Sequence, residues 1–443
     1  MATQRQRIWG WYAFDWASQP FFTLILTFIF APYFVTVVGD AVEAQAQWAS
    51  MLLWIGLASA VLAPIIGALA DQSGYLIRWV AGLTLIYCLG SAGLWYAVPG
   101  METLWPVLLA FAVAMIAAEM ATIVTNAFLP SLGRDSEIGE ISGNGFAIGY
   151  AGGFLALVIM LGFFAQGPDG RTFLGLPPAF GLDPDSYQGT RMVGPLAAFW
   201  FAVFMIPFFV FIKDPVRPGP KMSLGNAVRS AGANLKTMVK RASGRPSLIM
   251  FLTSSMFYRD ALNGLYTFGG VYAAGVLGWS TVDVGVFGII GVISAVLASW
   301  WGGKMDGRYG PKAVISVCIP LLMLVSLMIV SMGRDSVLWF ELGPNSNLPD
   351  IIMYICGAVV GGAGGSLQAA SRSLMVRHAE DDRPTEAFGL YAMTGKATAF
   401  LAPLLVNVAT EMSGDQRIGV SPLIVLFLIG LALLPWVKRD GDT

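Results

Sequence analysis

The sequence predicts an all-α protein that crosses a membrane many times. Of its 443 residues, 56% are hydrophobic and only 12% are charged, and this charged share is about half of what a typical soluble domain carries. The apolar residues are gathered into runs that reach the length of about 20 residues needed for a membrane-spanning helix. This composition excludes a secreted, disordered or nucleic-acid-binding chain.

Twelve apolar runs reach this length, and each is expected to form one membrane helix because lipid forces backbone groups to bond within the segment. The runs are 9–38, 48–70, 78–98, 104–128, 143–165, 192–212, 247–277, 281–303, 311–332, 349–371, 385–410 and 419–437. The first run follows Arg5 and Arg7 as in a signal peptide, but it is too long for one and contains Asp15. No cleavable signal is therefore expected.

Lysine and arginine in the loops predict the orientation, because cytoplasmic loops are enriched in them. With the N-terminus inside, 20 of the 26 basic residues fall on the cytoplasmic side, among them Arg372, Arg377 and Arg383. Another 4 fall on the opposite side, and Arg259 and Lys396 lie within runs. Both termini are expected in the cytoplasm, with the protein in the inner (plasma) membrane of a bacterium.

The longest and most basic connection follows the sixth run and divides the chain. Three prolines near its start prevent a helix there, but 223–242 has apolar residues at helical spacing opposite basic ones. This segment is expected to lie along the membrane surface against anionic lipid; the alternative is a plain solvated linker. The predicted parts are a six-helix half at 1–213, the linker at 214–246, and a second six-helix half at 247–443.

Short matching segments indicate that the two halves are repeats. A tight loop with glycines and an aspartate at the helix end follows the second run and again the eighth. A carboxylate also recurs in the first span of each half, as Asp15 and Asp260. Internal repeats with a site between them are typical of secondary transporters. The loop residues expected to govern conformational change are Gly67, Asp71 and Gly74 in the first half and Asp306, Arg308 and Gly310 in the second.

Five segments carry a resemblance to a known family: 67–74, 302–312, YAFDW at 12–16, TNAFLP at 125–130, and 365–396 with GSLQAASRS and EAFGLY. The two loops resemble the signature of the major facilitator superfamily and its degenerate second copy. The other segments resemble the vacuole-effluxer-like branch of that superfamily, whose fungal member exports amino acids. Gln72, Tyr75 and Leu76 depart from the signature, which usually has basic residues there.

This resemblance implies the major facilitator fold, in which twelve helices form two six-helix halves and spans one, four, seven and ten line a central cavity. It implies a carrier that moves a small organic solute, such as an amino acid or a short peptide, by alternating access. We expect coupling to protons, contact with membrane lipid and action as a monomer, with no cofactor.

Five ionisable side chains within the runs are candidate solute- and proton-binding groups: Asp15, Glu119, Arg259, Asp260 and Lys396. Unpaired, they would cost roughly 12–17 kcal/mol in total, at about 2.5–3.5 kcal/mol each. Glu119 and Asp260 lie deepest and are the better proton carriers, unless they form static ion pairs with the basic residues. For Asp15, near the cytoplasmic end of the first run, contact with lipid headgroups is an equally good interpretation. Lys396 either neutralises a solute carboxylate or, slightly favoured, ties its span to a neighbour.

Adjacent residues on a helix point about 100° apart, so Arg259 and Asp260 are expected to meet different partners. The further candidate cavity residues are Asn126, Tyr258, Tyr266 and Gln368. Glycines that recur every three or four residues let helices approach closely, either as static packing or as surfaces on which the fifth and eighth spans slide. They are Gly145, Gly149 and Gly153, then Gly285, Gly288 and Gly291, and then Gly357, Gly361 and Gly365.

Several features exclude other functions. Cys88, Cys318 and Cys356 lie in apolar runs, and with the single His378 they form no metal-binding or disulfide pattern. The sequence has no phosphate-binding G-x-x-x-x-G-K-[ST] loop and no Ser-His-Asp arrangement, so neither an ATP-driven pump nor an enzyme is expected. The remaining alternative is a non-transporting assembly factor or sensor, which would not need charged residues within its spans.

Overall fold

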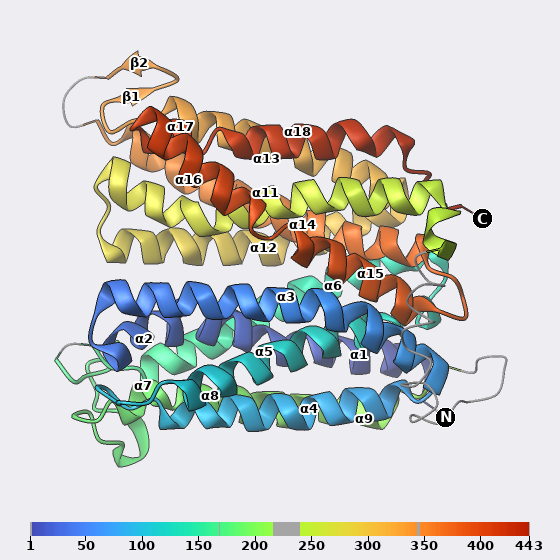
Figure 1. Cartoon of the computed structure of the whole chain (residues 1–443), viewed down its shortest axis with the longest axis horizontal. Helices are drawn as coiled ribbons and strands as arrows, with labels where there is room; N and C mark the ends of the chain where they lie inside the picture. The colour runs from blue at the N-terminus through green and yellow to red at the C-terminus, as the bar shows by residue number, and fades with distance from the viewer. Residues whose placement is uncertain (1, 168, 216–239, 343–345, 443) are drawn as a thin grey trace. The chain divides into compact units, whose positions relative to one another are not determined.

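The computed structural model describes residues 2–167, 169–215, 240–342 and 346–442, which are mostly helical (Figure 1). The chain separates into two compact units, Met1–Leu132 with Ile148–Arg229 and Gly133–Ala147 with Ser230–Thr443. Helix α6 (Asp135–Phe163) therefore supplies its first turns to the second unit and the remainder to the first. The surface helix expected at 223–242 lies almost entirely outside the described residues.

The first unit is made up of helices of very different lengths. They are α1 (Gln4–Pro20), α2 (Phe30–Val38), α3 (Ala41–Ser73), α4 (Leu76–Gly93), α5 (Trp105–Asn126), the later turns of α6, α7 (Gln188–Arg191), α8 (Val193–Phe204) and α9 (Ile206–Phe211), with a π-helix at Phe21–Phe28 and 3-10 turns at Leu94–Tyr96, Leu129–Ser131 and Ala179–Gly181. Its core is aromatic: Trp11, Phe21, Tyr87, Phe111 and Phe201 are all at most 1% exposed.

The first predicted span is a bent pair of helices rather than one straight helix. Pro20 has no N–H, so the carbonyl oxygen of Trp16 lacks its usual partner within the helix. The indole Nε1 of Trp200 in α8 donates to that oxygen at 3.2 Å, and the two indoles stack with centroids 5.7 Å apart. The chain then passes through the π-helix and bends by 44° into α2.

The second unit contains the first turns of α6 and all elements from α11 onward. These are α11 (Pro246–Leu277), α12 (Thr281–Tyr309), α13 (Pro311–Ser331), α14 (Leu348–His378), α15 (Pro384–Ala397), α16 (Leu401–Ser413), α17 (Gln416–Gly419), α18 (Pro422–Leu433) and a 3-10 turn at Leu434–Trp436. A short antiparallel hairpin of β1 (Ser336–Val337) and β2 (Phe340–Glu341) follows α13, with Val337 paired to Phe340. It is the only sheet among the described residues (Figure 1).

Ten helical segments of the described chain are long and apolar enough to cross a membrane, and the bent first pair raises the number to eleven. The seventh predicted span corresponds to α11, which is 32 residues long but too polar to be counted among them. Polarity within such a long helix requires burial against protein, because lipid offers polar groups no partners. The structure thus establishes a multi-span helical protein.

The two repeated loops both turn at a glycine with a positive φ. Gly74 ends α3 with a φ of 65°, and Gly310 separates α12 from α13 with a φ of 87°. Positive φ is readily adopted only by glycine, which explains why both loops need one. Asp71 lies in the last turn of α3 and Asp306 in the last turn of α12. Arg308 is exposed, and its guanidinium lies over the ring of Tyr309.

The end of the tenth span was predicted too early. The run stops at residue 371, but α14 continues to His378. Arg372 and Arg377, which we expected in a cytoplasmic loop, therefore belong to a helix, and Arg372 is only 4% exposed. The helix extends because its polar last turns are packed against protein, so that apolarity no longer marks its end.

Candidate functional site

The charged pair at the centre of α11 faces the broken helix formed by α15 and α16. Asp260 is 1% exposed, and its Oδ2 accepts the backbone N–H of Ala402 at 2.8 Å. Its Oδ1 has no hydrogen-bond partner among the described residues. Because the first N–H groups of a helix have no partner within the helix, Asp260 caps the start of α16 from a different segment of the chain.

The predicted eleventh span, 385–410, is interrupted. Helix α15 ends at Ala397 and α16 begins at Leu401, and the turn between them is closed by a bond from Leu401 N to Thr398 O at 2.7 Å. Lys396 lies in the last turn of α15, where the helix dipole favours a cation. Discontinuous membrane helices commonly build transporter binding sites, since their ends present unbonded backbone groups.

Arg259 contacts the other side of this break. Its Nη1 donates to the carbonyl oxygen of Tyr391 at 2.9 Å, and its Cζ lies 4.0 Å from the centre of the Tyr391 ring. Gly395 leaves room for the guanidinium, because a Cβ there would lie 2.8 Å from Cζ. As predicted, Arg259 and Asp260 meet different partners. Arg259 contacts Tyr391 of α15, and Asp260 accepts a hydrogen bond from α16.

A series of ring contacts runs from Arg259 to the end of α14. The Tyr391 ring stacks on that of Phe251 at 5.8 Å with an interplanar angle of 9°. Phe251 in turn stacks on the imidazole of His378 at 5.4 Å and 23°. Offset stacking at these separations stabilises a ring pair by about 0.5–1.5 kcal/mol beyond the burial of its area. The series connects the charged centre of α11 with the first turn of the same helix.

His378 is buried and both of its ring nitrogens are hydrogen-bonded, although charged residues surround it in the sequence. Its Nδ1 donates to Leu374 O at 3.0 Å, which leaves Nε2 to accept from the Ser247 hydroxyl at 2.8 Å. The Ser247 oxygen in turn accepts the backbone N–H of Lys438 at 2.8 Å. This tautomer is assigned from the hydrogen bonds. With a neutral ring it satisfies both imidazole nitrogens and the Ser247 hydroxyl.

The end of the chain caps the start of α11. The two carboxylate oxygens of Asp442 accept the N–H groups of Ser247 and Leu248 at 3.1 and 3.0 Å. Arg245, just before the helix, donates to His378 O at 2.7 Å. We call this set of contacts among Arg245, Ser247, His378, Lys438 and Asp442 the terminal clasp.

Asp442→Ala is expected to loosen the first turn of α11, because the change removes a charged cap from a helix N-terminus. Loss of such a cap costs about 0.5–2 kcal/mol. Hydrogen exchange of the amides at 247–250 should accelerate, as measured by mass spectrometry in detergent. Asp440→Ala is the control, since the Asp440 side chain is 81% exposed; equal acceleration in both variants would contradict the cap.

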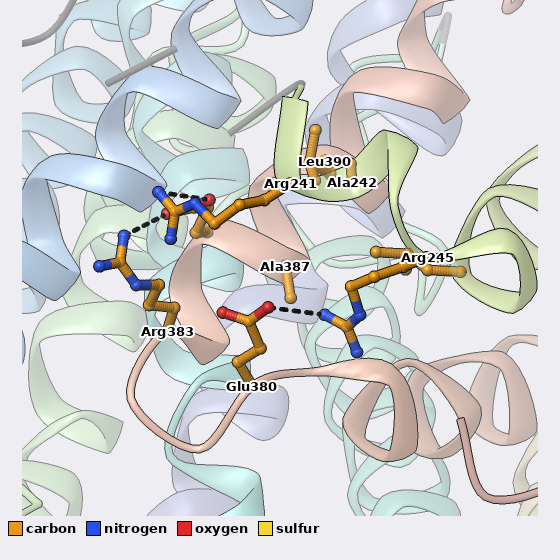
Figure 2. A pocket seen from close by; sticks show the side chains of 9 residues that line it. Arg241, Ala242, Arg245, Glu380, Arg383, Ala387 and Leu390 are labelled. Atoms are coloured by element: carbon orange, nitrogen blue, oxygen red, sulfur yellow. Dashed lines mark hydrogen bonds and ion pairs between the residues drawn. The ribbon is translucent and has the colours of Figure 1, made fainter. Parts of the chain in front are cut away.

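A small charged pocket of about 20 Å³ lies beside the terminal clasp. Figure 2 shows that Arg245 and Glu380 point toward one another, and their ion pair is 3.3 Å long. Arg241 and Arg383 both pair with Glu386, at 3.8 and 3.5 Å. Each carboxylate in the pocket is thus bonded to arginine, which favours a structural network over a catalytic site.

The two candidate tyrosines of α11 differ in their surroundings. Tyr258, expected to face a cavity, is instead fully buried, with its hydroxyl 2.7 Å from Ser371 Oγ in α14. A buried phenol needs such a partner, so Tyr258 connects two helices. Tyr266 is 45% exposed, and its hydroxyl approaches Gly364 of α14. Gln368, one turn further along α14, is half-buried.

Arg372 is a polar residue that sequence reasoning missed. Its Nε and Nη2 donate to the hydroxyl and carbonyl oxygens of Ser142 at 2.9 and 2.7 Å, and Ser142 donates to Ala369 O. The guanidinium also lies 4.3 Å from the centre of the Phe146 ring. These contacts fasten the first turns of α6 to α14, and the only sequence signal was an arginine beside small residues.

Glycines set the packing of α6 differently from the prediction. Gly149 faces α1, where an added Cβ would meet Asp15, and Gly153 faces the π-helix that follows α1, where it would meet Thr23. The contacts with α12 are made nearer the start of α6, where Gly143 packs on Gly303 and Gly139 on the buried side chain of Asp306. The fifth and eighth spans therefore meet through a pair of glycines that the predicted series did not include.

The first-unit candidates lie on helices of that unit. Helix α1 begins at Gln4, five residues before the predicted run, so Asp15 is about 16 Å along it. Glu119 lies in α5 and is half-buried, and Asn126 is the last residue of that helix.

Comparison with known proteins identifies the family. The family model described as "Vacuole effluxer Atg22 like" matches residues 37–441. The chain belongs to the vacuole effluxer Atg22-like family. It is 23% identical over 442 residues to the uncharacterized MFS-type transporter YxiO of Bacillus subtilis, covering 98% of this chain and 95% of that protein.

A fungal relative of this family member is autophagy-related protein 22-1 of Penicillium rubens, which is 25% identical over 312 residues. That match covers 68% of this chain and 49% of the relative, so the chain spans about half the length of the fungal protein. The fold is similar to that of a variant of the E. coli fucose:proton symporter FucP, with a TM-score of 0.69 at 13% identity and 98% coverage of both chains.

These findings confirm the predicted resemblance. The Atg22-like chain is a multi-pass membrane protein of the major facilitator type, and its family and fold are those of transporters rather than enzymes.

Proposed function

We propose that this Atg22-like protein is a secondary active transporter that moves a small organic solute across the bacterial inner membrane by alternating access. Twelve spans in two six-helix halves, 1–213 and 247–443, would form the carrier, joined by the linker 214–246. An amino acid or short peptide is the proposed solute, and protons are the proposed coupling ion. The carrier would act as a monomer surrounded by membrane lipid.

The observation that supports this proposal most is the pair of charges in α11. Arg259 and Asp260 lie in a long helix and contact a helix that breaks beside them. Such an arrangement is costly in a membrane and is retained in proteins that bind charged solutes or ions. A scaffold or sensor would gain nothing from it.

Proton coupling is proposed for Asp260, with Glu119 as the second candidate. Asp260 Oδ1, which has no hydrogen-bond partner in the described part of the chain, can carry a proton while Oδ2 still accepts the N–H of Ala402. Two solved proteins of similar fold are named as a fucose:proton symporter and a proton:xylose symporter. They support protons as the proposed coupling ion. Lys396 and Gln368 are proposed to line the solute path, as are Asn126 and Tyr266.

A flux assay in proteoliposomes tests the proposal. A panel of radiolabelled amino acids and dipeptides is offered under an imposed pH gradient, and at least one should accumulate above its outside concentration. Accumulation should vanish when a protonophore collapses the gradient. Empty liposomes and protein-containing liposomes without a gradient are the controls. The absence of flux for every solute in the panel would favour the assembly factor or sensor.

The proposed topology can be tested by cysteine labelling. In a background with serine at the three native cysteines, Asp185→Cys should react with an impermeant maleimide on intact cells. Glu380→Cys should react only after permeabilisation, because the positive-inside rule places it in the cytoplasm. Asp185 lies in a polar connection and Glu380 is in the α14–α15 turn, so both sites are accessible. The reverse pattern would overturn the orientation.

A further inference from the structure

Arg259, near the middle of α11, has no counter-charge among its contacts in the described part of the chain. Its guanidinium bonds one backbone carbonyl and lies over one aromatic ring, both of Tyr391. Among the described residues it makes no ion pair, and Asp260 beside it bonds the backbone of Ala402 instead. Neither the carbonyl nor the ring carries a negative charge that would neutralise the arginine.

The contacts of Arg259 hold its guanidinium in place but occupy only one of its nitrogen atoms in the described part of the chain. One Nη1 bond leaves Nε and Nη2 without acceptors among the described residues. A guanidinium fork presents paired N–H groups that match the two oxygens of a carboxylate or a phosphate. The Tyr391 ring holds the plane of this fork, and Phe251 supports that ring from within the core. The arginine is therefore organised before an anion arrives.

We propose that Arg259 binds an anionic group, a carboxylate or a phosphate, on the transported solute. The inference rests on the proposed transport function and adds to it the charge of the solute and the residue that recognises it. Tyr391 is a positioning residue, which acts by orienting the guanidinium through its ring and its backbone carbonyl. Neutral solutes of the same size would leave the arginine uncompensated and would bind poorly.

The test compares solutes that differ in the anionic group alone. Wild-type protein in proteoliposomes is assayed for counterflow of leucine against leucinamide and of glycerol 3-phosphate against glycerol. The first pair reports on a carboxylate and the second on a phosphate. We expect one acid to be carried at least about tenfold better than its neutral partner, as for loss of a charged hydrogen bond.

Variants then assign the preference to Arg259. Arg259→Gln should lower counterflow of the acid by about 10- to 100-fold and leave the neutral partner unchanged. Arg259→Lys should be intermediate, because it keeps the charge but not the fork. Tyr391→Phe keeps the ring and the backbone carbonyl and should behave as wild type, whereas Tyr391→Leu should lose part of the preference. Arg334→Gln, which alters an arginine paired with Asp350, is the charge-matched control.

Two results would overturn the assignment. One is equal counterflow of acid and neutral partner in the wild type, and the other is an unchanged preference in Arg259→Gln. In either case solute is still transported, so the result contradicts the anion site at Arg259 but not the proposed transport function. Failure of the wild type to carry any of these solutes or those of the flux panel contradicts both proposals together.

Discussion

Asp260→Asn is expected to abolish pH-driven accumulation of solute while leaving counterflow intact. The amide imitates the protonated carboxyl permanently, so the carrier can exchange solute but cannot load and release a proton. The amide oxygen can still accept the N–H of Ala402, as Oδ2 does at 2.8 Å in the native protein. The start of α16 therefore keeps its cap, and the variant should fold normally.

Measuring counterflow and pH-driven uptake in the same proteoliposomes separates coupling from stability. Asp260→Ala is the matched comparison, because it removes both the proton site and the cap and should lower thermal stability by about 1–3 kcal/mol. Glu119→Gln is the parallel test in the first unit. Full pH-driven accumulation in both Asp260→Asn and Glu119→Gln would show that these carboxylates do not couple transport, and a uniporter or another coupling ion would follow.

Gly361→Ala is expected to separate α12 from α14 and to destabilise the second unit. A Cβ at Gly361 would collide with the backbone carbonyl of Gly291, which cannot move without displacing its helix. A Cβ at Gly357, one turn earlier in α14, would likewise collide with the ring of Phe287. Overpacking in a close contact costs about 1–3 kcal/mol, so the melting temperature in detergent should fall clearly.

Gly285→Ala provides the matched control on α12. A Cβ at that position would meet nothing within 4 Å, and alanine favours a helix over glycine by up to about 1 kcal/mol. This variant should keep or slightly raise the melting temperature. Similar losses in Gly361→Ala and Gly285→Ala would mean that helix–helix contact at Gly361 does not limit stability.

The family and the membrane-spanning character could be predicted because both are encoded in short segments. Burial in lipid depends on the composition of about 20 consecutive residues, so the run 311–332 corresponds closely to α13, and the run 48–70 lies within the longer α3. The turns at Gly74 and Gly310 were equally local, since a positive φ depends on one residue. The signature segments around them sufficed for the family.

The candidate site was predicted in composition but not in arrangement. The sequence drew attention to Arg259, Asp260 and Lys396 because charges are rare in apolar runs. It could not show that Asp260 caps α16, that Arg259 stacks on Tyr391, or that α15 and α16 are separate. Those partners are far apart along the chain, and no periodicity connects residue 260 with residue 402.

What the sequence by itself determined is the kind of protein: a helical membrane carrier of one family, with charges in particular spans. Tertiary structure alone decided how each charge is satisfied, from the bonds between Arg372 and Ser142 to the cap that Asp442 places on α11. The physical reason is that partition into lipid is a property of each segment, whereas a buried polar group takes whichever partner the packing of distant segments brings within hydrogen-bonding distance.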